Sequence, residues 1–272
     1  MSRHLGKVFV AIGATLAAVA MMAPAAQADT PEVGYEQFAG CPSPKTENPT
    51  VRTCIRGVVT SGHIRFGKTD MPISIPIGLS GGIDTFGGGF FSSPKGGMES
   101  IKEPVPGGLF GGTKLLANLL NLKQLDLYAV TELAGTPGFS PSLLHLPIKV
   151  HLINAALGNN CYIGSNANPM VLDLTTGTTS PPPPNKPIAG VTPGTGFEPV
   201  REILFLNNGT YVDNSFAAPG ATGCVLKLGG GGFSLNVNSL VNSKVGLPAP
   251  AGINEAVMNL NAEVASSEFV YP

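Results

Sequence analysis

The sequence has little charge and few aromatic side chains, and both shortages exclude classes of protein. Charged residues make up 12% of the 272 positions, about half the average share, while 43% of the residues are apolar. This combination is the opposite of a disordered composition, and it also argues against a coiled coil or a histone-like basic protein. Tryptophan is absent and aromatic residues reach only 7%, which disfavours a carbohydrate-binding face of stacked rings.

Long apolar runs are lacking after the first thirty or so residues. Residues 1–28 have the pattern of a secretory signal peptide, because Arg3 and Lys7 precede the apolar stretch 8–20 and Ala26-Gln27-Ala28 fits a cleavage site. We expect the mature chain to begin at Asp29; an uncleaved N-terminal anchor is the alternative. No later run is long enough for a transmembrane helix, so none is expected in the mature chain.

An excess of basic charge is missing as well. Removing Arg3 and Lys7 lowers the 16 basic residues to 14 against 17 acidic ones, which gives the mature chain a net charge of −3. Nucleic-acid binding needs a basic surface, so no nucleic-acid partner is expected.

Four cysteines remain in the mature chain, and their even number predicts two disulfides in an oxidising compartment. They are Cys41, Cys54, Cys161 and Cys224. Three pairings are possible; we favour Cys41 with Cys54 and Cys161 with Cys224, because near neighbours in the sequence meet most easily. No two cysteines have the spacing of a zinc site and no histidine lies nearby, so we expect neither a metal nor a cofactor.

The fold class follows from the 36 glycines, the 25 prolines and an alternation of apolar and polar residues with a period of two. We predict an all-β fold, mainly an antiparallel β-sandwich or barrel, with one or two short helices and long Gly/Pro-rich loops. Residues 29–272 form a single β domain whose N-terminal segment is stapled by a disulfide. Strands are expected at 55–60, 63–66, 73–79, 124–133, 144–152, 170–174, 225–228 and 256–264.

Several local patterns refine this expectation. Pro72, Pro76 and Pro147 cannot donate to a strand ladder, so their strands are expected at sheet edges. Asn208-Gly209 between two apolar runs predicts a β-hairpin with a type I′ turn over residues 203–212. Leucine-rich residues 113–123 predict a helix, whereas 236–246 fit either a helix or a loop. The prolines at 181–184 predict a loop between sheets, with an interdomain linker as the alternative.

One motif resembles the nucleophile loop of serine hydrolases. Ser80 lies in Gly78-Leu79-Ser80-Gly81-Gly82, and His63 precedes it in a protease-like context. The two residues are too close in sequence for a trypsin-like barrel to fit between them, and no helix is expected after Ser80 as an α/β-hydrolase requires. A glycine-rich turn is the simpler interpretation, so we assign no catalytic residue.

Other candidate groups also fail on spacing. His145 and His151 share a strand face but lie roughly 20 Å apart in an extended chain, which excludes a shared metal. Residues 107–114 reverse the order that a phosphate loop needs. The acids Glu99, Glu103, Glu198 and Glu202 show no spacing that singles out a catalytic pair.

Four segments carry a resemblance. They are residues 159–169 (NNCYIGSNANP), 174–185 (LTTGTTSPPPPN), 214–220 (NSFAAPG) just before Gly223-Cys224, and Gly246-Leu247-Pro248. Together they resemble a group of uncharacterised secreted proteins of actinobacteria, and the likeness extends over most of the mature chain. The resemblance implies export by a Gram-positive bacterium and brings no assigned activity or site residues.

These observations lead to a first hypothesis and two alternatives. We expect a secreted, non-catalytic β protein that binds or builds in the cell envelope or the extracellular medium. Because the strands carry little charge on either face, a membrane-inserting or lipid-binding β protein is the first alternative. An extracellular hydrolase is the second.

Overall fold

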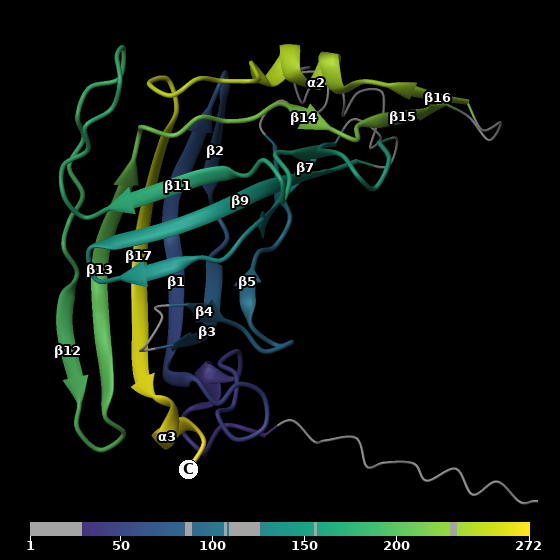
Figure 1. The fold of residues 1–272 in the computed structure, drawn as a ribbon. Helices are drawn as coiled ribbons and strands as arrows, with labels where there is room; N and C mark the ends of the chain where they lie inside the picture. Colours follow the sequence, from purple (N-terminus) through teal and green to yellow (C-terminus); the bar gives the residue numbers. More distant parts are fainter. Residues whose placement is uncertain (1–28, 85–88, 106–107, 109–125, 155–156, 229–232) are drawn as a thin grey trace, which may run out of the picture.

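The computed structural model describes residues 29–84, 89–105, 108, 126–154, 157–228 and 233–272, and within them the protein is mostly antiparallel β-sheet. The main sheet has 15 strands, nine of which follow the path β14-β10-β9-β11-β13-β17-β1-β3-β4. Strands β15 and β16 form a separate two-stranded sheet. Figure 1 shows that the main sheet curls back on itself. The predicted all-β, mainly antiparallel class is confirmed.

Two groups of strands face each other across the interior. The first, the β17 half, contains β1 (Val51–Phe66), β3 (Ile77–Asp84), β12 (Gly194–Glu198), β13 (Ile203–Asp213) and β17 (Glu255–Ser266). The second, the β9 half, contains β7 (Tyr128–Leu133), β8 (Gly138–Ser140), β9 (Leu143–Ile153), β10 (Tyr162–Ile163) and β11 (Met170–Thr175). In Figure 1, β9 and β11 cross the strands of the β17 half at a steep angle.

Shorter elements complete the described chain. The remaining strands are β2 (Thr69–Ile73), β4 (Phe90–Phe91), β5 (Gly97–Glu99), β6 (Glu103–Pro104), β14 (Ala221–Thr222), β15 (Val225–Leu228) and β16 (Phe233–Asn236). The helices are α2 (Asn238–Val245), α3 (Ser267–Val270) and the single 3-10 turn η1 (Glu36–Phe38). None of the helices in these described ranges has the length and apolar character of a membrane span.

The main core lies between the two halves and depends on strict alternation in two central strands. On β9, alternate residues from Leu144 to Leu152 are buried, as a period of two requires. They face alternate residues of β17, among which Ala256 and Ala262 are small enough to let the crossing strands approach closely. The residues between them on β9 include His145 and His151, which lie on the outer face.

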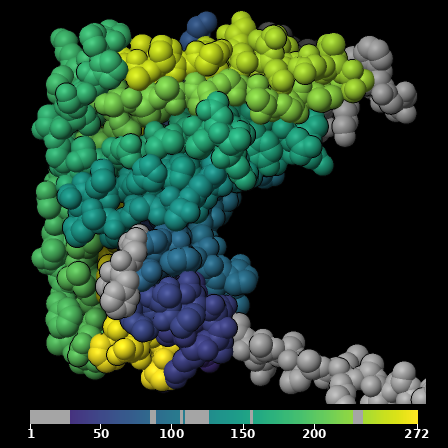
Figure 2. All heavy atoms as spheres, in the orientation of Figure 1, coloured from purple at the N-terminus to yellow at the C-terminus, as the bar shows by residue number. Residues whose placement is uncertain are grey.

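A second apolar cluster covers the opposite face of the β17 half. Its members are Tyr35, Phe38, Cys41, Val51, Cys54, Ile203, Ala265, Val270 and Tyr271. The N-terminal segment and α3 meet here, as the purple and yellow spheres at the lower end of Figure 2 show. The Tyr271 hydroxyl donates to the Cys41 carbonyl over 2.7 Å, and burial raises the pKa of Tyr271 to about 12.

Both predicted disulfides are present with the favoured pairing. Cys41 bonds to Cys54, and Cys161 bonds to Cys224. The first holds the N-terminal segment on the second apolar cluster, while the second joins the loop before β10 to the start of β15. Such bonds persist in oxidising environments, so the protein is suited to one.

Two predicted turns are instead bulges within long strands. Residues 55–66 all lie in the single strand β1 (Val51–Phe66), whose register against β17 shifts between Val59 and Ser61. The hairpin expected at Asn208-Gly209 is wrong, because β13 runs straight through it and its register against β17 shifts between Leu206 and Gly209. Asn208 does adopt a positive φ of 57°, but its backbone N–H donates to the Asn261 side chain and the chain does not reverse.

The edge position predicted from Pro147 is also wrong. β9 is central, with β11 on one side and β7 and β8 on the other. Pro147 is tolerated because it lies where the neighbour changes from β7 to β8, and its carbonyl accepts the Ala134 N–H over 2.8 Å. The strand expected over 73–79 is broken at Pro76 into β2 and β3, both of which pair with β1. Among the described strands β2, which carries Pro72, pairs with β1 alone and is an edge strand as predicted, whereas β3 also pairs with β4 and β5.

The remaining local predictions concern residues 236–246, the prolines at 181–184 and the segment 107–123. Of the two interpretations left open for residues 236–246, the helix is observed as α2. The prolines at 181–184 lie in the long connection between β11 and β12, and the Asn185 N–H after them donates to the Gly252 carbonyl. The helix predicted at 113–123 and the rejected phosphate loop at 107–114 fall outside the described residues, apart from Gly108.

The bulge in β1 generates a stability prediction. Gly62 has a φ of 137°, and an added Cβ would lie 2.0 Å from the Val257 carbonyl oxygen of β17. We expect Gly62→Ala to lower the free energy of unfolding by about 3 kcal/mol, because the backbone must shift and a strained conformation is retained. Urea unfolding followed by circular dichroism measures the change.

Gly57 on the same strand is the matched control. A Cβ there would meet its nearest atoms, Leu79 O and Leu260 Cδ1, at 3.8 and 3.9 Å, which is ordinary contact. Gly57→Ala should therefore be neutral or stabilise by roughly 0.5 kcal/mol, since alanine restricts the unfolded chain. Equal losses in both variants would contradict the bulge geometry.

Candidate functional site

A cavity of about 370 Å³ opens at the end of the fold where α2 lies. It is bounded by α2, by the turn between β1 and β2, by the chain around β6 and β7, and by the start of β15. These elements lie together at the upper end of Figure 1. Two gaps in the core between the halves measure only about 20 and 30 Å³, so this space is not ordinary packing imperfection.

Helix α2 and the residue before it form one wall because valines repeat there every four residues. Val237, directly before the helix, and Val241 and Val245 within it are buried, and Leu240 joins them at the cavity while remaining 53% exposed. Gly246 ends the helix in the left-handed conformation, with a φ of 78°, and its N–H donates to the Asn242 carbonyl. The valine spacing was present in the sequence and could have predicted this wall.

The opposite wall is built from four aliphatic residues that are distant in sequence. They are Val105, Leu127, Leu157 and Leu226. Leu157 and Leu226 form an isolated antiparallel bridge, and the Gly158 N–H donates to the Val225 carbonyl over 2.8 Å. No sequence pattern connects these positions, so the cavity could not be predicted.

The Cys161–Cys224 disulfide fixes how these walls meet. Cys224 directly precedes β15, its N–H donates to the Asn238 side chain at the start of α2, and its carbonyl accepts the Val237 N–H. Cys161 directly precedes β10, which pairs with β9. The bond therefore connects α2 and β15, which contribute to the two cavity walls, to the β9 half.

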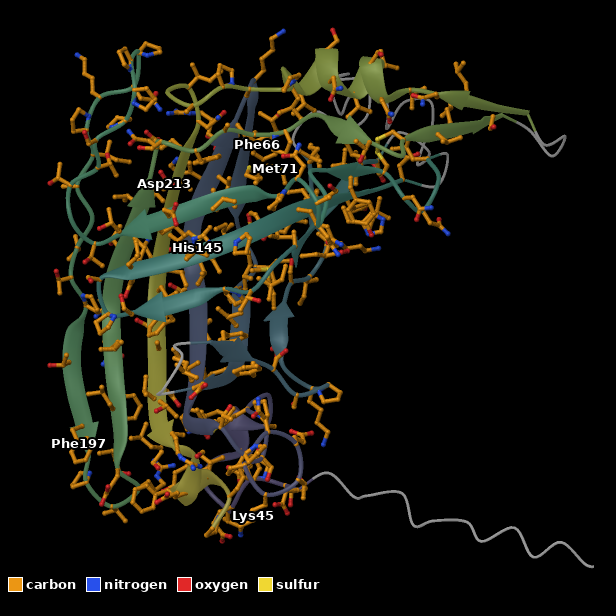
Figure 3. The ribbon with its side chains drawn as sticks, in the orientation of Figure 1. Lys45, Phe66, Met71, His145, Phe197 and Asp213 are labelled. Atoms are coloured by element: carbon orange, nitrogen blue, oxygen red, sulfur yellow. A yellow bond between two sulfur atoms is a disulfide. The ribbon has the colours of Figure 1, made fainter. Side chains whose placement is uncertain are left out.

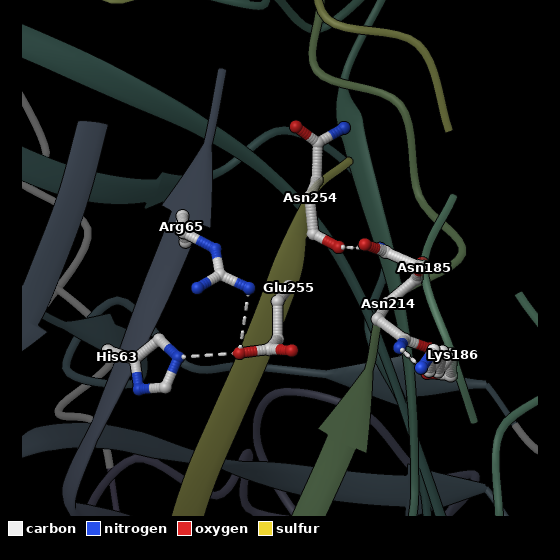
Figure 4. Close-up of polar contacts among 7 residues, drawn as sticks. All are labelled: His63, Arg65, Asn185, Lys186, Asn214, Asn254 and Glu255. Atoms are coloured by element: carbon white, nitrogen blue, oxygen red, sulfur yellow. Dashed lines mark hydrogen bonds and ion pairs between the residues drawn. The ribbon is translucent and has the colours of Figure 1, made fainter. Parts of the chain in front are cut away.

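A polar network around Asn254, part of which Figure 4 shows, holds the β1–β2 turn at the cavity rim. The Asn254 carboxamide oxygen accepts the Gly67 N–H over 3.0 Å, and its nitrogen donates to the Phe216 and Pro250 carbonyls. Asn185 donates to the Asn214 and Asn254 carbonyls and so joins the proline-rich connection to the same point. The Asn254 amide is fully buried and structural, because backbone groups satisfy it.

Three charged residues line the cavity where it opens to solvent. They are Lys68 and Asp70, beside the β1–β2 turn, and Lys244 in the last turn of α2. All three are exposed, whereas most of the aliphatic lining is buried. The site thus combines an apolar interior with a charged rim, and such pockets bind molecules that have an apolar body.

A second, more open hollow of about 410 Å³ lies against the outer side of β11. Asp213 contributes to its lining and is only 4% exposed; its carboxylate accepts the Asp173 and Ser215 N–H groups, each over 2.8 Å. Burial raises the pKa of Asp213, although these two hydrogen bonds oppose the shift. Because both oxygens already bind backbone, Asp213 connects β13 to β11 and is not placed for chemistry.

The histidines of β9 have separate acidic partners. His145 Nδ1 lies 2.6 Å from Asp173 Oδ1, and His151 Nδ1 lies 3.3 Å from Glu132 Oε1. Figure 3 labels His145 on β9 and Asp213 at the end of β13. Both histidines occupy outward polar positions, as predicted. Within the described residues, no three His, Cys, Asp or Glu side chains are grouped so that they could hold a metal ion.

The structure places Ser80 away from any catalytic partner. Its side chain is 2% exposed under Gly40, and its hydroxyl has no hydrogen-bond partner. Ser80 pairs with Arg56 across β1 and β3, seven residues along β1 from His63, whose own partner is Glu255. The serine-hydrolase interpretation of this motif therefore has no geometric support.

The acids noted in the sequence have separate partners too. Glu99 pairs with Arg56 at 3.1 Å, and Glu198 pairs with Arg201 at 3.1 Å, where the backbone N–H of Arg201 holds the pKa of Glu198 below its usual range. Glu103 accepts the Ser74 and Ile75 N–H groups, at the break between β2 and β3. Glu202 adopts a positive φ of 52° in the turn before β13. None of these interactions joins two carboxylates into a catalytic pair.

The buried, unpartnered hydroxyl of Ser80 generates a prediction. We expect Ser80→Ala to raise the free energy of unfolding by about 1 kcal/mol, because it removes a polar group that gains nothing from burial. Labelling by a fluorophosphonate probe should be equally absent from the wild type and the variant.

Ser267→Ala serves as the control. Ser267 is equally buried, but its hydroxyl donates to the Val51 carbonyl over 3.0 Å, so its loss should destabilise by about 1 kcal/mol. Probe labelling that disappears in Ser80→Ala would restore the hydrolase interpretation.

Comparisons with known proteins do not assign the protein to a family. The chain matches no family model, no curated protein and no solved structure. The cavity beside α2 is therefore the feature on which a functional argument can be based.

Proposed function

We propose that the protein is a secreted, non-catalytic β protein that binds a lipid-like molecule in the cavity beside α2. The observation that carries this proposal is the cavity of about 370 Å³ with aliphatic walls, which lies within the usual size range of small-molecule sites. The proposal combines two expectations drawn from the sequence: a non-catalytic binding role and the lipid-binding alternative.

Apolar burial supplies the driving force for such binding. Each methylene group moved from water into an apolar cavity contributes about 0.8 kcal/mol. The wall from α2 and the opposite wall of Val105, Leu127, Leu157 and Leu226 present valine and leucine side chains, so a hydrocarbon chain finds contacts along its length. Among the described lining residues, no buried polar group has to lose water to receive it.

The polar residues of the site favour binding over catalysis. Among the described residues of the lining, the ionisable ones are Lys68, Asp70 and Lys244, and all are exposed at the rim. Nucleophilic catalysis needs a nucleophile within hydrogen-bond reach of a base. The described lining offers no Ser, Cys or His for that role, and Thr69 is its only hydroxyl.

The proposed location is outside the cell. Two disulfides suit an oxidising compartment, and residues 1–28 have the pattern of a signal peptide. The resemblance to secreted actinobacterial proteins supports an origin in that group. A place in the cell envelope or the surrounding medium would bring the cavity close to membrane lipids.

The cavity proposal predicts binding of a fluorescent fatty acid. Wild-type protein should enhance the fluorescence of parinaric acid. Val241→Phe should weaken binding about tenfold, because the larger ring takes up space equivalent to roughly two methylenes of ligand. Val241 faces the cavity, which has room for the ring, so we expect the melting temperature to stay close to that of the wild type.

Val200→Phe is the control, since Val200 is exposed and lies outside the cavity lining. It should leave the fluorescence titration unchanged. Absence of binding by the wild type, or equal binding by Val241→Phe, would contradict the proposal.

Export makes a separate prediction about the natural protein. When it is collected from the medium or envelope of the producing cell, its N-terminal residue should be Asp29, and alkylation under denaturing conditions should modify none of the four cysteines. Mass spectrometry of the intact and proteolysed protein measures both. A retained N-terminal segment or free thiols would contradict export by signal-peptide cleavage.

A further inference from the structure

The charges at the cavity rim distinguish between kinds of apolar ligand. Lys68 and Asp70 lie at the two ends of a short stretch beside the β1–β2 turn, and both line the opening. A ligand whose chain fills the apolar interior would therefore place its other end among these groups. Whether that end is negative, neutral or positive depends on the balance of charge there.

The turn holds Lys68 in a fixed position. The Lys68 N–H donates to the Val245 carbonyl over 2.7 Å, and the Gly67 N–H donates to Asn254. The Lys68 stem lies against Gly246, where an added Cβ would come within 2.8 Å of Lys68 Cγ. The backbone and stem of this lysine are thus anchored to the end of α2 beside the cavity.

The ammonium group of Lys68 is available to a ligand. Among the described residues, it takes part in no ion pair within 4.0 Å, unlike Arg56, Arg65, Lys149 and Arg201. Lys244 contributes a second positive charge at the opening but is already engaged in an interaction within the protein. The argument therefore depends on Lys68.

Asp70 opposes an anion, but a neighbouring cation reduces its effect. Its register partner across β1 and β2 is Arg65, and opposite charges at such positions attract. Arg65 also contacts Glu255 Oε1 at 3.1 Å. Lys68, Asp70 and Lys244 line the opening, and Arg65 and Glu255 lie next to it on β1 and β17, so three positive groups stand against two negative ones in this region.

We propose that the ligand is a single-chain amphiphile with an anionic head group, such as a fatty carboxylate. This inference rests on the proposed function and deepens it by naming the ligand class. The hydrocarbon chain lies between α2 and the opposite aliphatic wall, and the carboxylate lies at the opening beside the Lys68 ammonium. Its pairing with Lys68 is screened by water on one side only, because apolar walls form the other.

Two ligands with the same chain and different heads test the inference. Isothermal titration calorimetry should show that wild-type protein binds laurate more tightly than lauryl alcohol. Lys68→Gln keeps a long polar side chain but removes the charge, and it should weaken laurate binding roughly two- to fivefold, the range of a partly exposed ion pair. Binding of lauryl alcohol to this variant should stay unchanged.

The opposite charge provides an internal control. Asp70→Asn should tighten laurate binding by a similar factor, and added salt should reduce the difference between wild type and both variants. Lys95→Gln, an exposed lysine outside the lining, should have no effect on either ligand.

The outcomes separate this inference from the proposed function. Parallel loss of laurate and lauryl alcohol in Lys68→Gln would show that Lys68 only supports the wall, and it would overturn the anionic head group. Unchanged laurate binding in both variants would overturn it too, while the cavity remained a binding site. Failure of the wild type to bind either ligand would overturn both proposals.

Discussion

The two halves of the main sheet can face each other because β11 and β13 diverge almost at once. They share a single pair of residues, Thr175 and Val212, whereas β11 pairs with β9 along its whole length. The Asp213 carboxylate strengthens this narrow junction by accepting the Asp173 N–H. Beyond it the strands cross, their aliphatic faces meet, and the end of the crossing leaves the space beside α2.

The sequence predicted the parts of the fold that depend on local alternation. The apolar period of β9 and β17 placed Leu144 and Met258 correctly inside, since either strand buries one face only. Asn208-Gly209 misled because a positive φ serves a bulge as well as a turn, and the choice depends on β17 beside it. Pro147 misled because a missing N–H does no harm where the neighbouring strand changes.

The candidate site could be predicted only in part. The valines of α2 share one face, so a helix with an apolar side was readable. Leu127, Leu157 and Leu226 come from separate segments that meet only after the sheet has curled and Cys161 has bonded to Cys224. Residue spacing along the chain carries no information about such a meeting. The strand pairing also excludes a catalytic site that the sequence contexts of Ser80 and His63 suggested. Ser80 pairs with Arg56, seven residues along β1 from His63, so the two side chains lie apart.

The ends of the described chain lie together, far from the cavity. The Glu32 N–H donates to the Val270 carbonyl, and the Lys45 ammonium contacts the Pro272 carbonyl, at the lower end of Figure 1, where α2 is at the upper end. A tether fused to Pro272, or to the chain just before Glu32, therefore attaches at the end of the fold opposite the cavity. The protein is suited to immobilisation on a sensor chip by either end without loss of access for a dissolved ligand.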